Sequence, residues 1–196
     1  IDVNCIEPDK FIDFYDCVKS SLTFEEKREF LTKYFAIIFS MYLDYQDESE
    51  IFMKEYNEMF SPSEMKELMS QKTLKNDTIL HQFVYLCKDL DFAKSFLTQF
   101  NETVSNTSIV TKTHTTVKEL ILQQESNTKC TAFMYTTWHS FDVDVFKYYL
   151  NFINKTLTRN ELVEHLKASN MFQFTAFHFA PWNNRSAEIG TEIFNL

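Results

Sequence analysis

The sequence predicts an all-α protein, and three observations lead to that fold class. The 196 residues include one glycine and three prolines, although tight β-turns and phosphate-binding turns need glycine at positive φ. Apolar residues recur at helical spacing, for example in "TFEEKREFLTKYF" (Thr23–Phe35). Similar segments also recur along the chain, which is typical of stacked helical units.

The first third of the chain predicts two amphipathic helices. Thr23–Phe35 has a capping-box start, and "ESEIFMKEYNEMF" (Glu48–Phe60) carries another apolar stripe at helical spacing. The apolar run "YFAIIFSMYL" (Tyr34–Leu43) is shorter than the ~18 residues that a membrane span requires. We therefore expect a buried helix there, no membrane association, and a degenerate unit or cap over residues 1–63.

Three later segments align on a threonine and indicate an internal repeat. They are "DTILHQFVYLCKDLDFAKSFL" from Asp77, "CTAFMYTTWHSFDVDVFKYYL" from Cys130 and "FTAFHFAPWNNRSAEIGTEIF" from Phe174. Similar residues stand at matched positions relative to the threonines Thr78, Thr131 and Thr175: Leu80, Phe133 and Phe177; His81, Met134 and His178; Tyr85, Trp138 and Trp182; Leu97, Leu150 and Phe194.

Each repeat reads as a helix, a turn and a second helix, followed by a further helix that leads to the next threonine. The threonine hydroxyl can accept from a free backbone N–H and so cap the first helix. Acidic residues in Asp89–Asp91 and Phe141–Asp144 favour the start of the second helix, because its N-terminus is the positive end of the dipole. The buried stripe of the second helix is expected at Phe92, Phe96, Leu97, Val145, Tyr149 and Leu150.

At these residues the chain resembles the ankyrin-repeat family, whose first helix begins T-x-L-H-x-A. "TILH" (Thr78–His81) and "TAFHFA" (Thr175–Ala180) match, whereas Met134 replaces the histidine in "TAFMYTT" (Thr131–Thr137). The resemblance implies a helical-repeat solenoid with lengthened repeats, with three units over 64–196 and one domain over 1–196. It also implies a structural, hydrogen-bonding role for Thr78, His81, Thr131, Thr175 and His178. Because the chain starts at Ile1 without methionine, we expect a fragment of a larger protein.

The chain departs from the family in its spacing and in its loops. The threonines are spaced more widely than the family's repeat of about 33 residues. Asn76, Lys129 and Gln173 stand where the family has glycine before each threonine, and lysine and glutamine adopt the left-handed conformation poorly. We therefore expect helical insertions at Thr116–Gln124 and Arg159–Ser169 in place of the usual β-hairpin loops.

The sequence predicts no enzyme, metal site or cofactor. It contains no HExxH, G-x-S-x-G, P-loop or G-x-G-x-x-G motif, and one glycine cannot form a phosphate-binding loop. The histidines His114 and His165 have no partner in the sequence pattern. The cysteines have no zinc-binding spacing, and we expect them to be buried, reduced thiols; they are Cys5, Cys17, Cys87 and Cys130.

Charge and cysteine usage indicate the kind of partner and the compartment. A net charge of −9 without a basic cluster argues against nucleic acid and favours a basic protein partner. Reduced thiols favour the cytoplasm. Five N-glycosylation sequons leave secretion open, and they begin at Asn76, Asn101, Asn106, Asn154 and Asn184.

The aromatic position of each repeat is the predicted binding site. In the ankyrin family this position lies at the exposed end of the first helix, on the concave face. The resemblance therefore predicts partner binding at Tyr85, Trp138 and Trp182, with His139 beside them. The turn between the two helices is one residue longer than in the family, and the alternative is that this longer turn rotates the rings into the core. We expect a non-enzymatic protein-interaction scaffold that binds through this concave face. The alternatives are the targeting region of a larger effector or toxin-like enzyme, and a helical domain with a pocket for an apolar ligand, which would fit the 21 phenylalanines.

Overall fold

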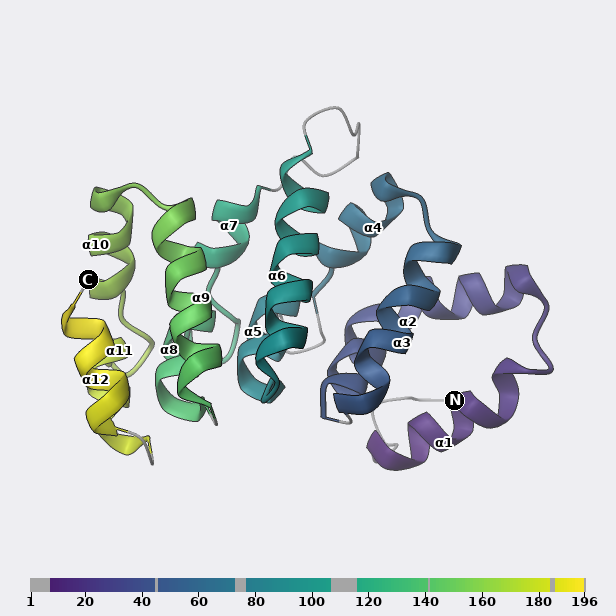
Figure 1. Ribbon diagram of the computed structural model, residues 1–196, viewed down its shortest axis with the longest axis horizontal. Coiled ribbons are helices and arrows are strands. Elements are labelled where there is room, and N and C mark those ends of the chain that lie inside the picture. The colour runs from purple at the N-terminus through teal and green to yellow at the C-terminus, as the bar shows by residue number, and fades with distance from the viewer. Residues whose placement is uncertain are drawn as a thin grey trace.

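The computed structural model describes residues 8–44, 46–72, 77–106, 116–140, 142–183 and 186–195. Throughout these ranges the regular structure is helical, without a β-strand, as predicted. Figure 1 shows the helices arranged side by side in a row that follows the order of the chain from the N-terminal to the C-terminal end. In the part of the chain that is described, no helix is both long and apolar enough to span a membrane.

The N-terminal region consists of α1 (Pro8–Lys19), α2 (Phe24–Asp44) and α3 (Gln46–Met59). The predicted capping box opens α2, where the hydroxyl and N–H of Thr23 donate to Glu26 Oε2 at 2.7 and 2.9 Å. The apolar segment Tyr34–Leu43 lies within α2 and supplies core residues such as Phe35 and Phe39. Helix α2 packs on α1, α3 and α5, so this region covers one end of the row.

The remaining helices repeat one order three times. Each group has a helix before the threonine, a helix that starts at the threonine, and a second helix after the turn. The groups are α4 (Pro62–Met69), α5 (Ile79–Leu86) and α6 (Leu90–Ser105); α7 (Val117–Leu122), α8 (Ala132–His139) and α9 (Val143–Thr156); and α10 (Arg159–Lys167), α11 (Ala176–Phe179) with the 3₁₀ turn η2 (Ala180–Trp182), and α12 (Ser186–Phe194).

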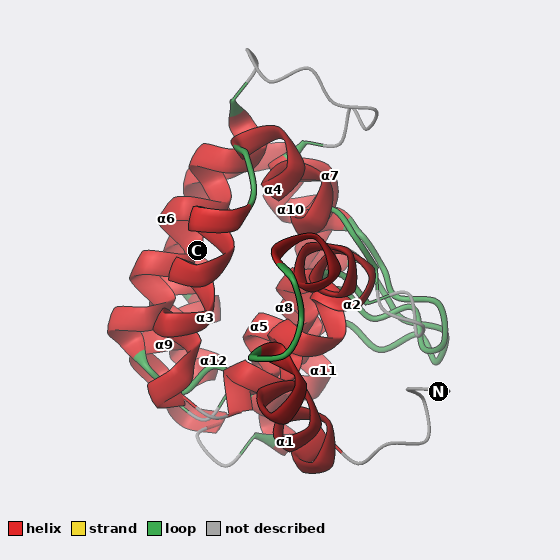
Figure 2. Cartoon of the chain, turned by 90° about the vertical axis from the view of Figure 1, so that its right-hand side faces the viewer, coloured by secondary structure: helices red, strands yellow, loops and turns green. Residues whose placement is uncertain are grey.

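Matched helices of successive groups pack on one another. Helix α8 contacts both α5 and α11, and α9 contacts both α6 and α12. Figure 2 looks along the row and shows two columns of helices, with loops projecting from one side. The groups therefore bury their apolar faces mainly against their neighbours in sequence.

The helix caps lie at the predicted residues. Thr78, Thr131 and Thr175 are the N-cap residues of α5, α8 and α11. Asp89 Oδ1 accepts from the N–H of Phe92 at 2.6 Å and caps α6. Asp142 Oδ1 caps α9 in the same way, and each such cap stabilises its helix by ~1 kcal/mol.

Phenylalanine rings connect several helices within the core. Phe96 lies 5.1 Å from Phe39 and 4.8 Å from Phe83, ring centre to ring centre, and so joins α2, α5 and α6. Phe133 and Phe146 pack in the same way between α8 and α9 at 6.3 Å. Close packing between helices thus gives these phenylalanines a role that needs no apolar ligand.

The loops before the threonines correct one prediction. Helices α7 and α10 form as expected. They do not replace the hairpin loops of the family, because a hairpin-like loop follows each of the two helices. Lys129 and Gln173 adopt left-handed conformations, with φ of 62° and 64°, and isolated antiparallel bridges join Lys72 to Thr78 and Gln124 to Thr131. Asn76 and His114 lie outside the described residues.

Hydrogen bonds hold these two loops in their unfavourable conformation. The buried carboxylate of Glu125 accepts from the N–H groups of Asn127 and Thr128 and from the Thr128 hydroxyl. In the next loop, Asn170 Oδ1 accepts from the N–H groups of Phe172 and Phe174, both at 2.9 Å. A left-handed lysine or glutamine costs about 1–2 kcal/mol, and two or three such bonds offset that cost.

The predicted burial of the cysteines holds only in part. Cys87 and Cys130 are buried free thiols, but Cys17 is free and exposed, so the prediction of burial is wrong there. It lies on the exposed side of α1, away from the core contact made by Tyr15. Cys5 and two sequon asparagines, Asn76 and Asn184, lie outside the described residues; the other sequon asparagines, Asn101, Asn106 and Asn154, are exposed.

Candidate functional site

The three aromatic residues at matched repeat positions lie at the surface. The exposed fraction is 42% for Tyr85 on α5, 36% for Trp138 on α8 and 55% for Trp182 on η2. The longer turn therefore does not rotate these rings into the core.

Ring contacts join these residues into one surface, which we call the aromatic strip: Tyr85, His139, Trp138 and Trp182. Tyr85 meets His139 edge-on at 4.7 Å, and the His139 ring stacks on Trp138 at 4.3 Å. Trp138 continues to Trp182 at 6.1 Å. The four side chains that the sequence pattern selects are thus in unbroken contact across three successive groups of helices.

A buried ring supports the strip from beneath. Phe179 is buried and stacks on Trp138 at 5.1 Å, and it also contacts Trp182 edge-on at 5.7 Å. Asn183 lies next to Trp182 in the chain, and its Nδ2 donates to the carbonyl oxygens of Thr137, Trp138 and Ser140 at 3.1–3.3 Å. Asn183 therefore caps the end of α8 from the following group and fixes the backbone that carries Trp138.

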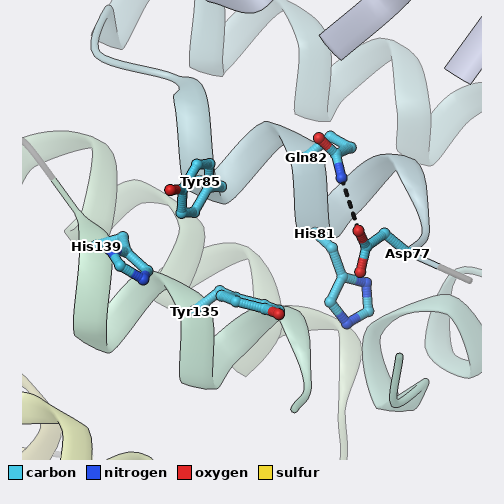
Figure 3. A pocket seen from close by; sticks show the side chains of 6 residues that line it. All are labelled: Asp77, His81, Gln82, Tyr85, Tyr135 and His139. Carbon is cyan, nitrogen blue, oxygen red and sulfur yellow. Dashed lines mark hydrogen bonds between the residues drawn. The ribbon is translucent and has the colours of Figure 1, made fainter. Parts of the chain in front are cut away.

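An open pocket of about 290 Å³ lies at the Tyr85 end of the strip. Figure 3 shows the side chains that line it. They come from α5, from α8 and from Asp77, which directly precedes the N-cap residue of α5. Gln82 Nε2 donates to Asp77 Oδ2 at 3.0 Å on one side of the pocket. The lining consists of Asp77, His81, Gln82, Tyr85, Tyr135 and His139.

His81 is held by hydrogen bonds through both ring nitrogens. Its Nδ1 accepts from the N–H and the hydroxyl of Thr78, at 3.2 and 2.8 Å. The proton is therefore on Nε2, which donates to the carbonyl oxygen of Cys130 at 3.2 Å. Burial lowers the pKa of His81 to about 4, so the ring is neutral at pH 7 and has no lone pair available as a general base.

The residues matched to His81 in the other two groups are His178 and Met134. Thr175 and His178 form the same local pair, at 3.1 Å from the N–H and 3.0 Å from the hydroxyl, but both are less buried. In the middle group, Thr131 Oγ1 accepts from the N–H of Met134 at 3.3 Å, and the methionine side chain is buried in the core. The motif thus forms a helix cap in all three groups and a bond between groups at His81.

His139 and His165 are the other two histidines within the described residues. Burial lowers the pKa of His139. His165 is buried 5.7 Å from the Phe133 ring, and its Nε2 has no hydrogen-bond partner. Across the described residues, no group of three histidine, cysteine or acidic side chains could hold a metal ion.

The sequence pattern does not select Tyr135, Asp77 or Asn183. The matched positions of Tyr135 in the other groups are Gln82 and Phe179, so the repeat gives no common signal there. Asn183 acts on a helix more than forty residues earlier, which only the stacking of the groups brings near.

Comparisons with known proteins found no matching family model, no matching curated protein and no matching solved structure.

Proposed function

We propose that the chain is an ankyrin-like solenoid of three units with an N-terminal cap, and that it is a non-enzymatic scaffold binding a protein partner through the aromatic strip. One observation carries this proposal: ring contacts join exposed rings from three successive groups into a single surface, with the half-buried His139 between Tyr85 and Trp138. A partner lying along the row would meet all of them.

The packing of the groups supports the solenoid. Matched helices pack in order, and ion pairs also connect successive groups: Lys118 on α7 pairs with Glu161 on α10, and Lys147 Nζ on α9 lies 3.4 Å from Glu192 on α12. In repeat arrays each unit is stabilised mainly by its neighbours. The shared Thr-capped helix start is the feature that links this arrangement to the ankyrin family.

The chemistry of the strip supports protein binding. Tryptophan and tyrosine are the residues most often found as interface anchors. Phe179 and the Asn183 cap already hold Trp138 in place, so that binding orders few additional rotamers. The net charge of −9 favours association with a basic partner, mainly through the association rate and specificity. The buried free thiols of Cys87 and Cys130 support a reducing compartment such as the cytoplasm.

Selection from a peptide-display library tests this function and requires no named partner. The full chain is the target, and the triple variant Tyr85→Ala, Trp138→Ala, Trp182→Ala is the counter-target. We expect peptides that bind the wild-type chain and lose binding to the triple variant. Phe24→Ala is the matched control, because Phe24 is an exposed aromatic residue outside the strip. Enriched peptides that bind the folded triple variant equally well would contradict the proposal.

A further inference from the structure

The pocket at the end of the strip combines aromatic walls with a carboxylate. The Tyr85 ring stands edge-on to His139 at 4.7 Å and to Tyr135 at 6.2 Å, so the rings meet nearly at right angles and form a corner. Asp77 lies on the other side of the pocket, held by Gln82. The six lining side chains that the structure describes include neither lysine nor arginine.

Acidic side chains lie near this corner, and its described lining has no basic side chain to neutralise them. Burial first, and then the charges of Glu125 and Asp77, raise the pKa of Tyr135 to about 12. Burial raises the pKa of Glu125, but hydrogen bonds from Thr128 and Asn127 outweigh it and lower that pKa, so this carboxylate stays ionised. Burial lowers the pKa of His81 and of His139, which leaves both rings neutral at pH 7.

We propose that this pocket receives one basic side chain, preferably arginine, from the bound protein partner. The electron-rich ring faces of Tyr85 and Tyr135 attract a cation, and the Asp77 carboxylate is its counter-charge. Arginine suits the corner better than lysine, because its planar guanidinium stacks on aromatic rings and donates to a carboxylate in a fixed geometry. A volume of about 290 Å³ is at the lower limit of small-molecule sites and suits a single long side chain.

This inference rests on the proposed function and specifies the chemistry of the partner. The charge of the whole chain alone would favour any basic surface, whereas the pocket selects one residue at a defined distance from the tryptophans. A bound peptide would therefore carry its arginine at the Tyr85 end and its apolar residues over Trp138 and Trp182.

Short capped peptides test the pocket directly. The probes are acetyl-Ala-Arg-Ala-amide, its lysine analogue, and its citrulline analogue, which keeps the shape of arginine but has no charge. Titration is followed by NMR of the ring protons of Tyr85, Tyr135 and His139. We expect the arginine peptide to shift these signals at millimolar concentration, the lysine peptide to bind more weakly, and the citrulline peptide to bind about tenfold more weakly.

Two variants keep the test decisive. Asp77→Asn retains an acceptor for Gln82 but removes the charge, and we expect it to weaken arginine binding about tenfold. Asp144→Asn, an exposed acid on α9, changes the net charge equally and should leave binding unchanged. If Asp77→Asn does not fold, Tyr85→Leu at an exposed position replaces it and should weaken binding several-fold.

Equal binding of the arginine and citrulline peptides, or no shift at millimolar peptide, would overturn this inference. That result would leave the proposed function standing if display-selected peptides still required Trp138 and Trp182. Conversely, arginine binding without any strip-dependent peptide would overturn the scaffold function and retain the pocket as a guanidinium site.

Discussion

The Nε2–H of His81 donates to the carbonyl oxygen of Cys130 at 3.2 Å. Through this bond, the residue that caps α5 with Thr78 also fastens the loop that precedes α8. The matched residue in the next group is Met134, which contributes apolar packing instead. The first and second groups therefore use different chemistry at the same repeat position.

Replacing His81 with methionine tests this bond. We expect His81→Met to lower the free energy of unfolding by about 2 kcal/mol, because a buried N–H of Thr78 and a carbonyl of Cys130 each lose a partner. His178→Met is the control, since that pair is exposed and only local; we expect it to cost less than about 1 kcal/mol. Urea unfolding of both variants measures the difference, and equal losses would contradict the role of His81 between groups.

Acidification is expected to destabilise the protein between pH 6.5 and pH 4. Burial lowers the pKa of His81 and of His165 from 6.5 to about 4 in the folded chain. Between these two pH values, protons bind preferentially to the unfolded chain. The free energy of unfolding is therefore at its full value above pH 6.5 and decreases as the pH falls toward 4. Each histidine contributes at most roughly 3 kcal/mol to this change.

His165→Leu separates the two histidines. Because His165 Nε2 is buried without a partner, we expect this variant to be more stable at pH 5 than the wild type and to show about half of its pH dependence. Thermal melts between pH 5 and pH 7 measure both effects. A wild-type stability that is constant across this range would show that the burial of the two rings has no such effect.

Substitutions at matched apolar positions should lower the free energy of unfolding by different amounts, depending on how deeply each side chain is buried. Leu97 and Leu150 are 1% and 5% exposed, whereas Phe194 at the matched position of the last group is 82% exposed. We expect Leu97→Ala and Leu150→Ala to cost about 2–5 kcal/mol each, and Phe194→Ala to cost less than about 0.5 kcal/mol. A large loss for Phe194→Ala in chemical unfolding would mean that another element covers this end of the row.

The helices and the matched aromatic positions could be predicted from sequence because their signals are local and repeated, whereas the sequence left open whether these rings are exposed or buried. A threonine cap, an acidic second helix start and an aromatic residue at a fixed offset recur along the chain, so each copy supports the others. The hairpin-like loops could not be predicted from the same signals. Lys129 and Gln173 disfavour positive φ individually, and the bonds that hold them include contacts between loops, such as Met171 N–H to Thr128 O at 2.7 Å.

The pocket could not be predicted from the sequence for a related reason. It depends on Tyr135, which differs from its matched residues, and on Asp77, which lies directly before the cap of α5. Nothing in either local segment indicates that the two side chains line the same pocket between α5 and α8. Only the stacking of successive groups places the ring and the carboxylate around one space.

Peptide affinity at Trp182 is the most direct test of the aromatic strip as a binding surface. Fluorescence polarisation of a labelled, display-selected peptide gives Kd for the wild type, Trp182→Ala and the control Phe24→Ala, each first shown to be folded by a thermal melt. We expect Trp182→Ala to raise Kd about thirtyfold or more, the effect of losing an anchor worth about 2 kcal/mol, and Phe24→Ala to leave Kd unchanged. An unchanged Kd for folded Trp182→Ala would contradict binding through the strip.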